Sequence, residues 1–212
     1  MTAARALSAA RKRLALTQAQ TATLLGTSQA NVSAYEKSQL QPGPLVEARI
    51  AAFAALTADS LYATYEAATL ASLAAQLRTD LHAARSEPDM LRLVIQASDD
   101  FARLTAPADR TFFLAEPSPT GSPAWDSLLA GLAVHLCRQA RLERTPRWVR
   151  DPARTLDSFW WVARDDLAVE VSGRGRPRAD SHQRAQARAL QEAIPSMRAR
   201  GVILSRRELE SV

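Results

Sequence analysis

The sequence is poor in residues that mark secreted or membrane proteins. Its single cysteine, Cys137, excludes a disulfide within the chain and fits a reducing compartment. The N-terminus has no apolar signal-peptide core, and no stretch reaches roughly 18 consecutive apolar residues. We therefore expect a cytoplasmic protein that does not contact a membrane.

The residue patterns of common catalytic and metal-binding motifs are also missing. The histidines lie far apart, without partners at ligand spacing: His82, His135 and His182. There is no P-loop, no dinucleotide-binding glycine pattern and no nucleophile elbow. The carboxylate pairs 99–100 and 165–166 are sequence neighbours, whose side chains point apart on a helix or a strand. The sequence thus predicts no metal, no cofactor and no enzymatic activity.

Alanine and arginine, in contrast, are abundant. Hydrophobic residues make up 47% of the chain, and many are alanine, the residue with the best helix propensity, so we expect a mainly α fold. The net charge of +5 favours nucleic acid or another polyanion as a partner. Lysine occurs only as Lys12 and Lys37, so a high-GC genome that encodes its basic residues as arginine is an alternative explanation for the charge.

Residues 17–37 predict two short helices joined by a tight turn. Thr17 and Ser28 are suited to cap the starts of the two helices, and Gly26 to end the first in a left-handed conformation. On the second helix, the apolar face and the polar face are separate. The polar face carries Gln29, Ser33 and Lys37. A helix with such a small polar face fits the DNA major groove.

Two further helices complete a predicted four-helix domain. Residues 3–15 form an amphipathic helix whose basic face either contacts phosphates or is simply solvated. A turn signal at 39–44 precedes a fourth helix at 45–56. Four short helices around one small core therefore occupy residues 3–56.

These residues resemble the phage-repressor type of helix-turn-helix, the xenobiotic-response-element (XRE) family of bacterial regulators. The matching positions are Leu14, Leu16, Thr17, Gln18, Ala22, Leu25, Gly26, Thr27, Ser28, Gln29, Val32, Ser33, Tyr35, Glu36, Lys37, Pro42 and Leu45. Thr21 departs from the pattern, since the family usually has a larger apolar residue there. The resemblance implies that residues 1–56 are a DNA-binding domain.

The resemblance also implies roles for single residues. The residue at the position of Gln18 contacts a phosphate and often supports the residue at the position of Gln29. Gln29 would read a base edge, for which adenine is the natural partner. Further base or phosphate contacts are implied for Thr27, Ser28, Asn31, Ser33 and Lys37, the last to a phosphate. For Thr27 and Ser28, helix capping alone is the alternative.

Residues 57–115 are predicted to form a helical connector or dimerisation region. Apolar residues recur at three- and four-residue steps and predict one long helix over 57–86, used either in the core or for dimerisation. A second helix is expected from about Pro88 to Leu104, and a short strand at Phe112–Phe113. The segment 57–122 has five arginines and nine carboxylates, so we do not expect it to lie along DNA.

A Pro-rich loop ending near residue 123 predicts a boundary, followed by a small α+β or mostly helical domain over 123–212. Helices are expected at 123–142 and 179–194, and strands within 162–171 and at 201–204. The aromatic and arginine residues of 144–161 either cover a core or form a partner-binding surface.

Two further resemblances lie in this C-terminal region. Arg174, Gly175 and Arg176, followed by Pro177, resemble the core of an AT-hook, which enters the minor groove, although a solvated loop is the alternative. The run from Trp148 to the end includes Pro195, Arg200-Gly201-Val202 and the closing Glu208-Leu209. With these residues it resembles C-terminal regions of bacterial antitoxins that pair with nucleotidyltransferase-type toxins.

The leading hypothesis is therefore a sequence-specific transcriptional regulator, a repressor that acts on double-stranded DNA as a homodimer in the nucleoid. The alternative is an antitoxin whose C-terminal region binds a toxin and whose N-terminal domain represses its own operon.

Overall fold

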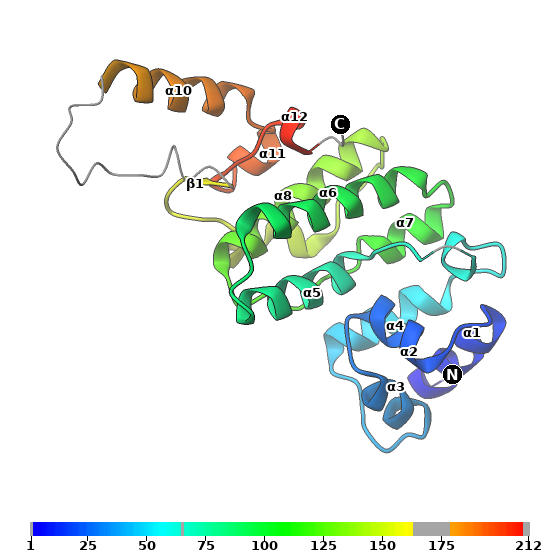
Figure 1. Cartoon of the computed structure of the whole chain (residues 1–212). Coiled ribbons are helices and arrows are strands. Elements are labelled where there is room, and N and C mark those ends of the chain that lie inside the picture. Colours follow the sequence, from blue (N-terminus) through cyan, green and yellow to red (C-terminus); the bar gives the residue numbers. More distant parts are fainter. Residues whose placement is uncertain (1, 65, 163–178, 210–212) are drawn as a thin grey trace. The chain divides into compact units, whose positions relative to one another are not determined.

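The structure, a computed structural model, describes residues 2–64, 66–162 and 179–209. This part of the chain is mainly helical (Figure 1). It contains one parallel sheet of two strands, which is consistent with the predicted fold class and confirms it. None of the described helices is long and apolar enough to cross a membrane.

The chain divides into two compact units. Unit 1 comprises residues 1–83 and 96–120, and unit 2 comprises residues 84–95 and 121–212. The long helix α6 (Glu87–Arg103) supplies residues to both. Unit 1 therefore continues well beyond residue 56, where the four-helix domain was expected to end.

Four short helices open unit 1, as predicted: α1 (Ala3–Arg13), α2 (Gln18–Leu25), α3 (Gln29–Glu36) and α4 (Pro44–Ala54). Helix α1 packs against α4, and α2 packs against α3. Their shared core contains Leu7, Leu14, Leu25, Val32, Ile50 and Phe53. The departure at Thr21 is accommodated, because this buried side chain donates its hydroxyl hydrogen bond to the carbonyl oxygen of Thr17 at 2.9 Å.

The single helix predicted over 57–86 is wrong. An irregular segment with one 3-10 turn, η1 (Leu61–Ala63), comes first, and α5 (Leu70–His82) begins only at Leu70. Buried Asp109, on α7 (Pro107–Phe113), accepts hydrogen bonds from the Ser60 hydroxyl at 2.7 Å and from the Leu61 N–H at 2.9 Å. Thr69 then caps α5. These hydrogen bonds to side chains give the segment an alternative to helical hydrogen bonding. The spacing of the apolar residues does not reveal such bonds.

Aromatic rings join the later elements of unit 1 to α4. The ring of Phe112 lies 5.6 Å from Phe53 and 5.2 Å from Tyr62, measured between centroids. Phe113 meets Phe101 at 5.0 Å. The strand predicted at Phe112–Phe113 is wrong, because both residues belong to α7 and their rings fill the core from a helix.

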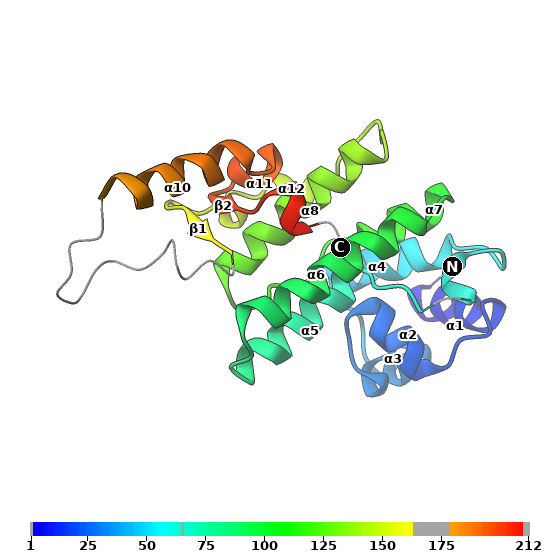
Figure 2. The ribbon, with the colours of Figure 1, turned by 45° about the horizontal axis from the view of Figure 1, so that its top comes forward.

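Unit 2 contains α8 (Pro123–Gln139), which is buried along most of its length. The smaller elements are η2 (Arg147–Arg150), η3 (Pro152–Arg154), β1 (Trp160–Trp161), α10 (Ala179–Glu192), α11 (Pro195–Arg198), β2 (Val202–Ile203) and α12 (Arg206–Leu209). Strands β1 and β2 pair in parallel, with Trp160 opposite Val202 (Figure 2). Helices α8 and α11 approach closely, since a Cβ on Gly131 would lie 2.9 Å from Cγ of Met197.

The predicted helices at 123–142 and 179–194 and the strand at 201–204 are confirmed. The strand expected within 162–171 falls mostly outside the described residues. Of the aromatic residues of 144–161, two pack in the core of unit 2, and the partner-binding alternative stays a prediction. Trp148 is buried and the Trp160 ring packs edge-on against Trp125 at 5.1 Å, whereas Phe159 is 52% exposed.

Candidate nucleic-acid interface

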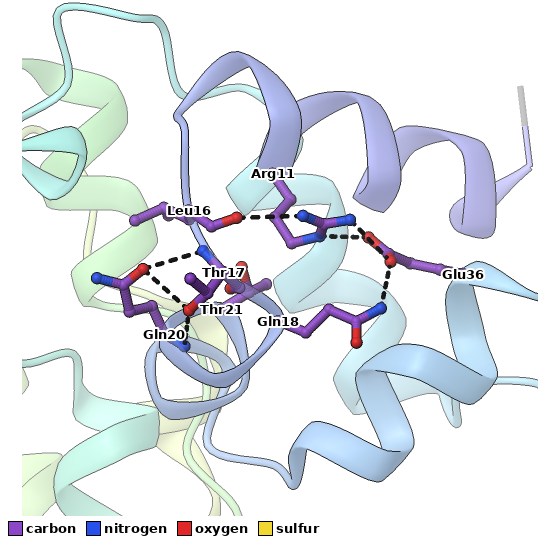
Figure 3. A network of polar contacts seen from close by, with 7 residues as sticks. All are labelled: Arg11, Leu16, Thr17, Gln18, Gln20, Thr21 and Glu36. Carbon is purple, nitrogen blue, oxygen red and sulfur yellow. Dashed lines mark hydrogen bonds and ion pairs between the residues drawn. The ribbon is translucent and has the colours of Figure 1, made fainter.

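Helix α2 starts at a complete capping box. The Thr17 hydroxyl oxygen accepts a hydrogen bond from the Gln20 N–H at 3.1 Å, and Oε1 of Gln20 accepts one from the Thr17 N–H at 2.9 Å (Figure 3). Two backbone donors that a helix start leaves without partners are thus satisfied. The predicted cap at Thr17 is confirmed, and its reciprocal partner is Gln20.

The turn after α2 requires glycine. Gly26 has φ of +64° and ψ of +41°, in the left-handed region, and the Thr27 N–H closes the helix on the Ala22 carbonyl oxygen at 2.9 Å. A Cβ at Gly26 would lie only 2.5 Å from the carbonyl oxygen of Ala71 on α5. Both the backbone angles and the close approach of α5 therefore exclude a side chain here.

Helix α3 starts on a second cap. The Ser28 hydroxyl oxygen accepts a hydrogen bond from the Asn31 N–H at 3.2 Å, and Nδ2 of Asn31 donates to the Thr27 hydroxyl oxygen at 3.0 Å. Ser28 is therefore the N-cap of α3, whereas the Thr27 hydroxyl accepts from a side chain and caps no backbone group of α3. Ser28 is nevertheless exposed, while Thr27 and Asn31 are half-buried.

The two faces of α3 are sharply different. Val32 and Tyr35 are buried, with 0% and 6% of their surface exposed. Gln29 and Lys37 are exposed, and Ser33 is half-buried. The predicted site residues of the turn and α3 therefore lie on one short stretch of chain. The other face of α3 is buried in the core.

One carboxylate connects the first three helices (Figure 3). Oε1 of Glu36, on α3, lies 2.7 Å from Nε of Arg11 on α1, and Oε2 accepts from Nη2 of Arg11 at 3.1 Å. Oε2 also accepts a hydrogen bond from Nε2 of Gln18, on α2, at 2.8 Å. Nη1 of Arg11 donates to the Leu16 carbonyl oxygen at 3.2 Å. Nε2 of Gln18 is therefore bonded to Glu36, and the phosphate contact and the support of Gln29 that the resemblance implies for Gln18 stay predictions.

This network changes the acidity of both charged groups. Burial alone would raise the pKa of Glu36, but the hydrogen bonds from Arg11 and Gln18 and the charges of Arg11 and Lys12 lower it below its ordinary value. The hydrogen bond to Glu36 raises the pKa of Arg11, against the opposing effect of burial. The pair is therefore ionised at neutral pH, and it fixes α3 to α1 and α2.

Sequence reasoning missed three residues that hold this stretch in place: Arg11, Glu36 and Arg49. Arg11 belongs by sequence to the basic face predicted for the first helix, but only 18% of its side-chain surface is exposed. Two features of the sequence could have indicated this burial: Arg11 lies beside the apolar stripe of α1, and an acidic residue ends α3. Arg49, on α4, is 1% exposed, and its place four residues from both Leu45 and Phe53, on the apolar face of the helix, was the available signal.

The remaining predicted site lies elsewhere in the chain: Arg174, Gly175 and Arg176 are outside the described residues. Across 2–64, 66–162 and 179–209, no group of three or more His, Cys, Asp or Glu side chains could hold a metal ion. The sequence was also compared with family models, with curated proteins and with solved structures, and none of them matches it.

Proposed function

We propose that this protein is a sequence-specific DNA-binding regulator of transcription, a repressor that acts as a dimer through its N-terminal helices. The observation that carries the proposal is the α2–turn–α3 unit, residues 17–37, in which two capped helices meet at a left-handed turn and α3 exposes a polar face. A protein surface of this form, a rigid helix with short polar side chains at its start, suits the DNA major groove.

The assigned contacts are those that the family resemblance implies, and the exposure and chemistry of the residues support them. Gln29 is the first residue of α3 and is exposed, so its amide can pair with N6 and N7 of adenine. Lys37 is exposed at the other end of α3 and supplies a positive charge for a phosphate. Ser28 and Ser33 add short polar groups. Ala30 offers only a methyl group, which suits the methyl group of thymine.

Dimerisation supplies the specificity that one such helix lacks. Few side chains of α3 are long enough to read bases, so one copy discriminates among few base pairs. Two copies related by a two-fold axis would place two α3 helices in successive major grooves, roughly 34 Å apart. Occupation of an operator that overlaps a promoter is then enough to repress transcription.

The proposal is tested by selecting duplexes from a random-sequence pool and footprinting them with wild-type protein, Gln29→Ala and Gln139→Ala. Gln139 is an exposed helical glutamine at the end of α8 and serves as the matched control. We expect two protected half-sites one helical turn apart, and an affinity loss of about tenfold or more for Gln29→Ala alone, as for one bidentate base contact. Equal protection by the wild type and Gln29→Ala would contradict the reading role.

A further inference from the structure

A buried arginine connects the turn between α2 and α3 to a distant segment of unit 1. Nη1 of Arg49 donates to the carbonyl oxygen of Leu25, the last residue of α2, at 2.9 Å. Nε donates to the carbonyl oxygen of Glu116 at 2.7 Å, and Nη2 donates to the hydroxyl oxygen of Ser118 at 3.0 Å. One guanidinium thus binds the end of α2 and the segment 116–118 simultaneously.

The end of α2 is held from outside the four-helix domain by other contacts as well. The Thr69 hydroxyl, at the start of α5, donates to the Leu24 carbonyl oxygen at 2.8 Å. The carbonyl oxygen of Ala71 on α5 lies so close to Gly26 that no Cβ fits between them. Carbonyl groups at a helix end lack intrahelical partners and carry the negative end of the helix dipole, so a buried cation there is strongly bound.

We propose that Arg49 is a positioning residue that makes the placement of α3 depend on segment 116–118. Gly26 and Thr27 follow directly on the carbonyl that Arg49 holds, so a shift of that carbonyl is passed to the start of α3. The chain enters unit 2 at Gly121, shortly after Ser118. Any change in unit 2 that displaces segment 116–118 would therefore change the geometry of the turn. That this amounts to control of DNA binding rests on the proposed function.

A purely stabilising arginine would behave differently. Removing its donors would cost stability, as for any side chain that satisfies buried acceptors, and that loss would speed amide exchange throughout unit 1. A positioning arginine instead has a local effect, at the backbone bonds of the turn. Those bonds are from the Gly26 N–H to the Thr23 carbonyl oxygen at 3.0 Å and from the Thr27 N–H to the Ala22 carbonyl oxygen at 2.9 Å.

Amide hydrogen exchange on the full-length protein separates the two possibilities. The variants are Arg49→Met, Arg49→Lys, Ser118→Ala and the double variant Arg49→Met/Ser118→Ala. The control is Asp109→Asn, which weakens the buried bonds to Ser60 and Leu61 in the same unit. In Arg49→Met we expect the amides of Gly26 and Thr27 to exchange about tenfold faster, as for loss of one hydrogen bond to a charged group, with the α7 amides unchanged.

The other variants test the connection itself. Arg49→Lys should restore part of the protection, because its single ammonium group can still reach one acceptor. Ser118→Ala should speed exchange at Gly26 and Thr27 about threefold, and should add nothing in the Arg49→Met background, because its effect passes through Arg49. The control should change exchange near Ser60 or throughout unit 1, but not selectively at the turn.

Three results would overturn the proposal: uniform acceleration throughout unit 1 in the Arg49 variants, no change at the turn in Ser118→Ala, or additive effects in the double variant. The exchange experiment contains no DNA. If the wild type enriches no duplex from the random pool, the proposed function fails while the exchange data still decide whether Arg49 positions the turn.

Discussion

Glu36 joins the first three helices through a single carboxylate, and its ionisation matters for stability. Only 9% of its side-chain surface is exposed, and the hydrogen bonds from Arg11 and Gln18 offset the cost of burying the charge. If Glu36 is made neutral, the guanidinium of Arg11 keeps its burial but loses its counter-charge. This asymmetry makes the pair costly to break, whatever its net contribution.

We therefore expect Glu36→Gln to lower the free energy of unfolding at pH 7 by about 1 to 3 kcal/mol, between the values for exposed and for buried ion pairs. Because the pKa of Glu36 is lowered in the folded state, the stabilisation is present above the ordinary pKa of a glutamate. It is lost as the pH falls through the folded-state value.

Urea unfolding curves of wild type and variant between pH 7 and pH 2 would measure this. The difference between the two proteins should shrink as the medium becomes acid. Glu47→Gln, an exposed carboxylate on α4, is the matched control and should change stability by less than about 0.5 kcal/mol. A difference between wild type and Glu36→Gln that stays constant over this pH range would contradict the assigned role.

For helices and turns, local chemistry was a reliable guide wherever the determining contacts were local. Thr17, Gly26 and Ser28 carry their own capping and turn signals, so the α2–α3 unit could be predicted from its sequence. The segment 57–69 could not, because Asp109, far along the chain, binds Ser60 and Leu61 and keeps them out of a helix. The polar face of α3 was likewise predictable, whereas its fixation by Arg11 and Arg49 depends on tertiary contacts.

The turn itself yields a prediction, since it combines backbone strain with a close approach. Gly26→Ala should lower the free energy of unfolding by about 2 kcal/mol or more. About 1 kcal/mol comes from the positive φ, and the rest comes from moving α5 away from the new Cβ. The clash involves the backbone oxygen of Ala71, so trimming a neighbouring side chain cannot relieve it.

The comparison is Gly43→Ala, measured in the same thermal and urea unfolding experiments. Gly43 precedes α4 with φ of −67°, and a Cβ there meets nothing within 4 Å. The free energy of unfolding of Gly43→Ala should stay within about 0.5 kcal/mol of the wild-type value. Alanine is a weaker N-cap than glycine, but it also makes the unfolded chain less flexible, and these two effects act in opposite directions. Similar losses for both variants would show that the contact with α5 is not tight.

The fold class of the whole chain could be predicted from its sequence, but its division into two compact units could not. Alanine content and apolar spacing indicated a mainly helical chain, and the loop before residue 123 was placed correctly. That α6 supplies residues to both units was not predictable, since its sequence shows no break between residues 95 and 96. The antitoxin hypothesis and the Arg174–Gly175–Arg176 contact stay predictions, because no described residue tests them.

This division makes the expected end of the DNA-binding domain testable. A fragment of residues 1–56 lacks Phe112, which packs on Phe53, and Thr69, which binds the end of α2. It also leaves buried Arg49 without the Glu116 and Ser118 acceptors. We expect this fragment to be less stable than a fragment of residues 1–120 by at least about 3 kcal/mol, the usual cost of deleting one buried aromatic contact.

Domains of this size have only about 5 to 15 kcal/mol of stability, so a loss of this size should lower the unfolding temperature of the short fragment by roughly 10 °C or more. Circular dichroism during thermal unfolding would measure the difference, and the fragment 1–120, which keeps every contact within unit 1, is the reference. If residues 1–56 unfolded as cooperatively and at as high a temperature as residues 1–120, the contacts of α5, α7 and segment 116–118 would be dispensable. Segment 116–118 would then add nothing measurable to the stability of the four-helix domain through its bonds to Arg49.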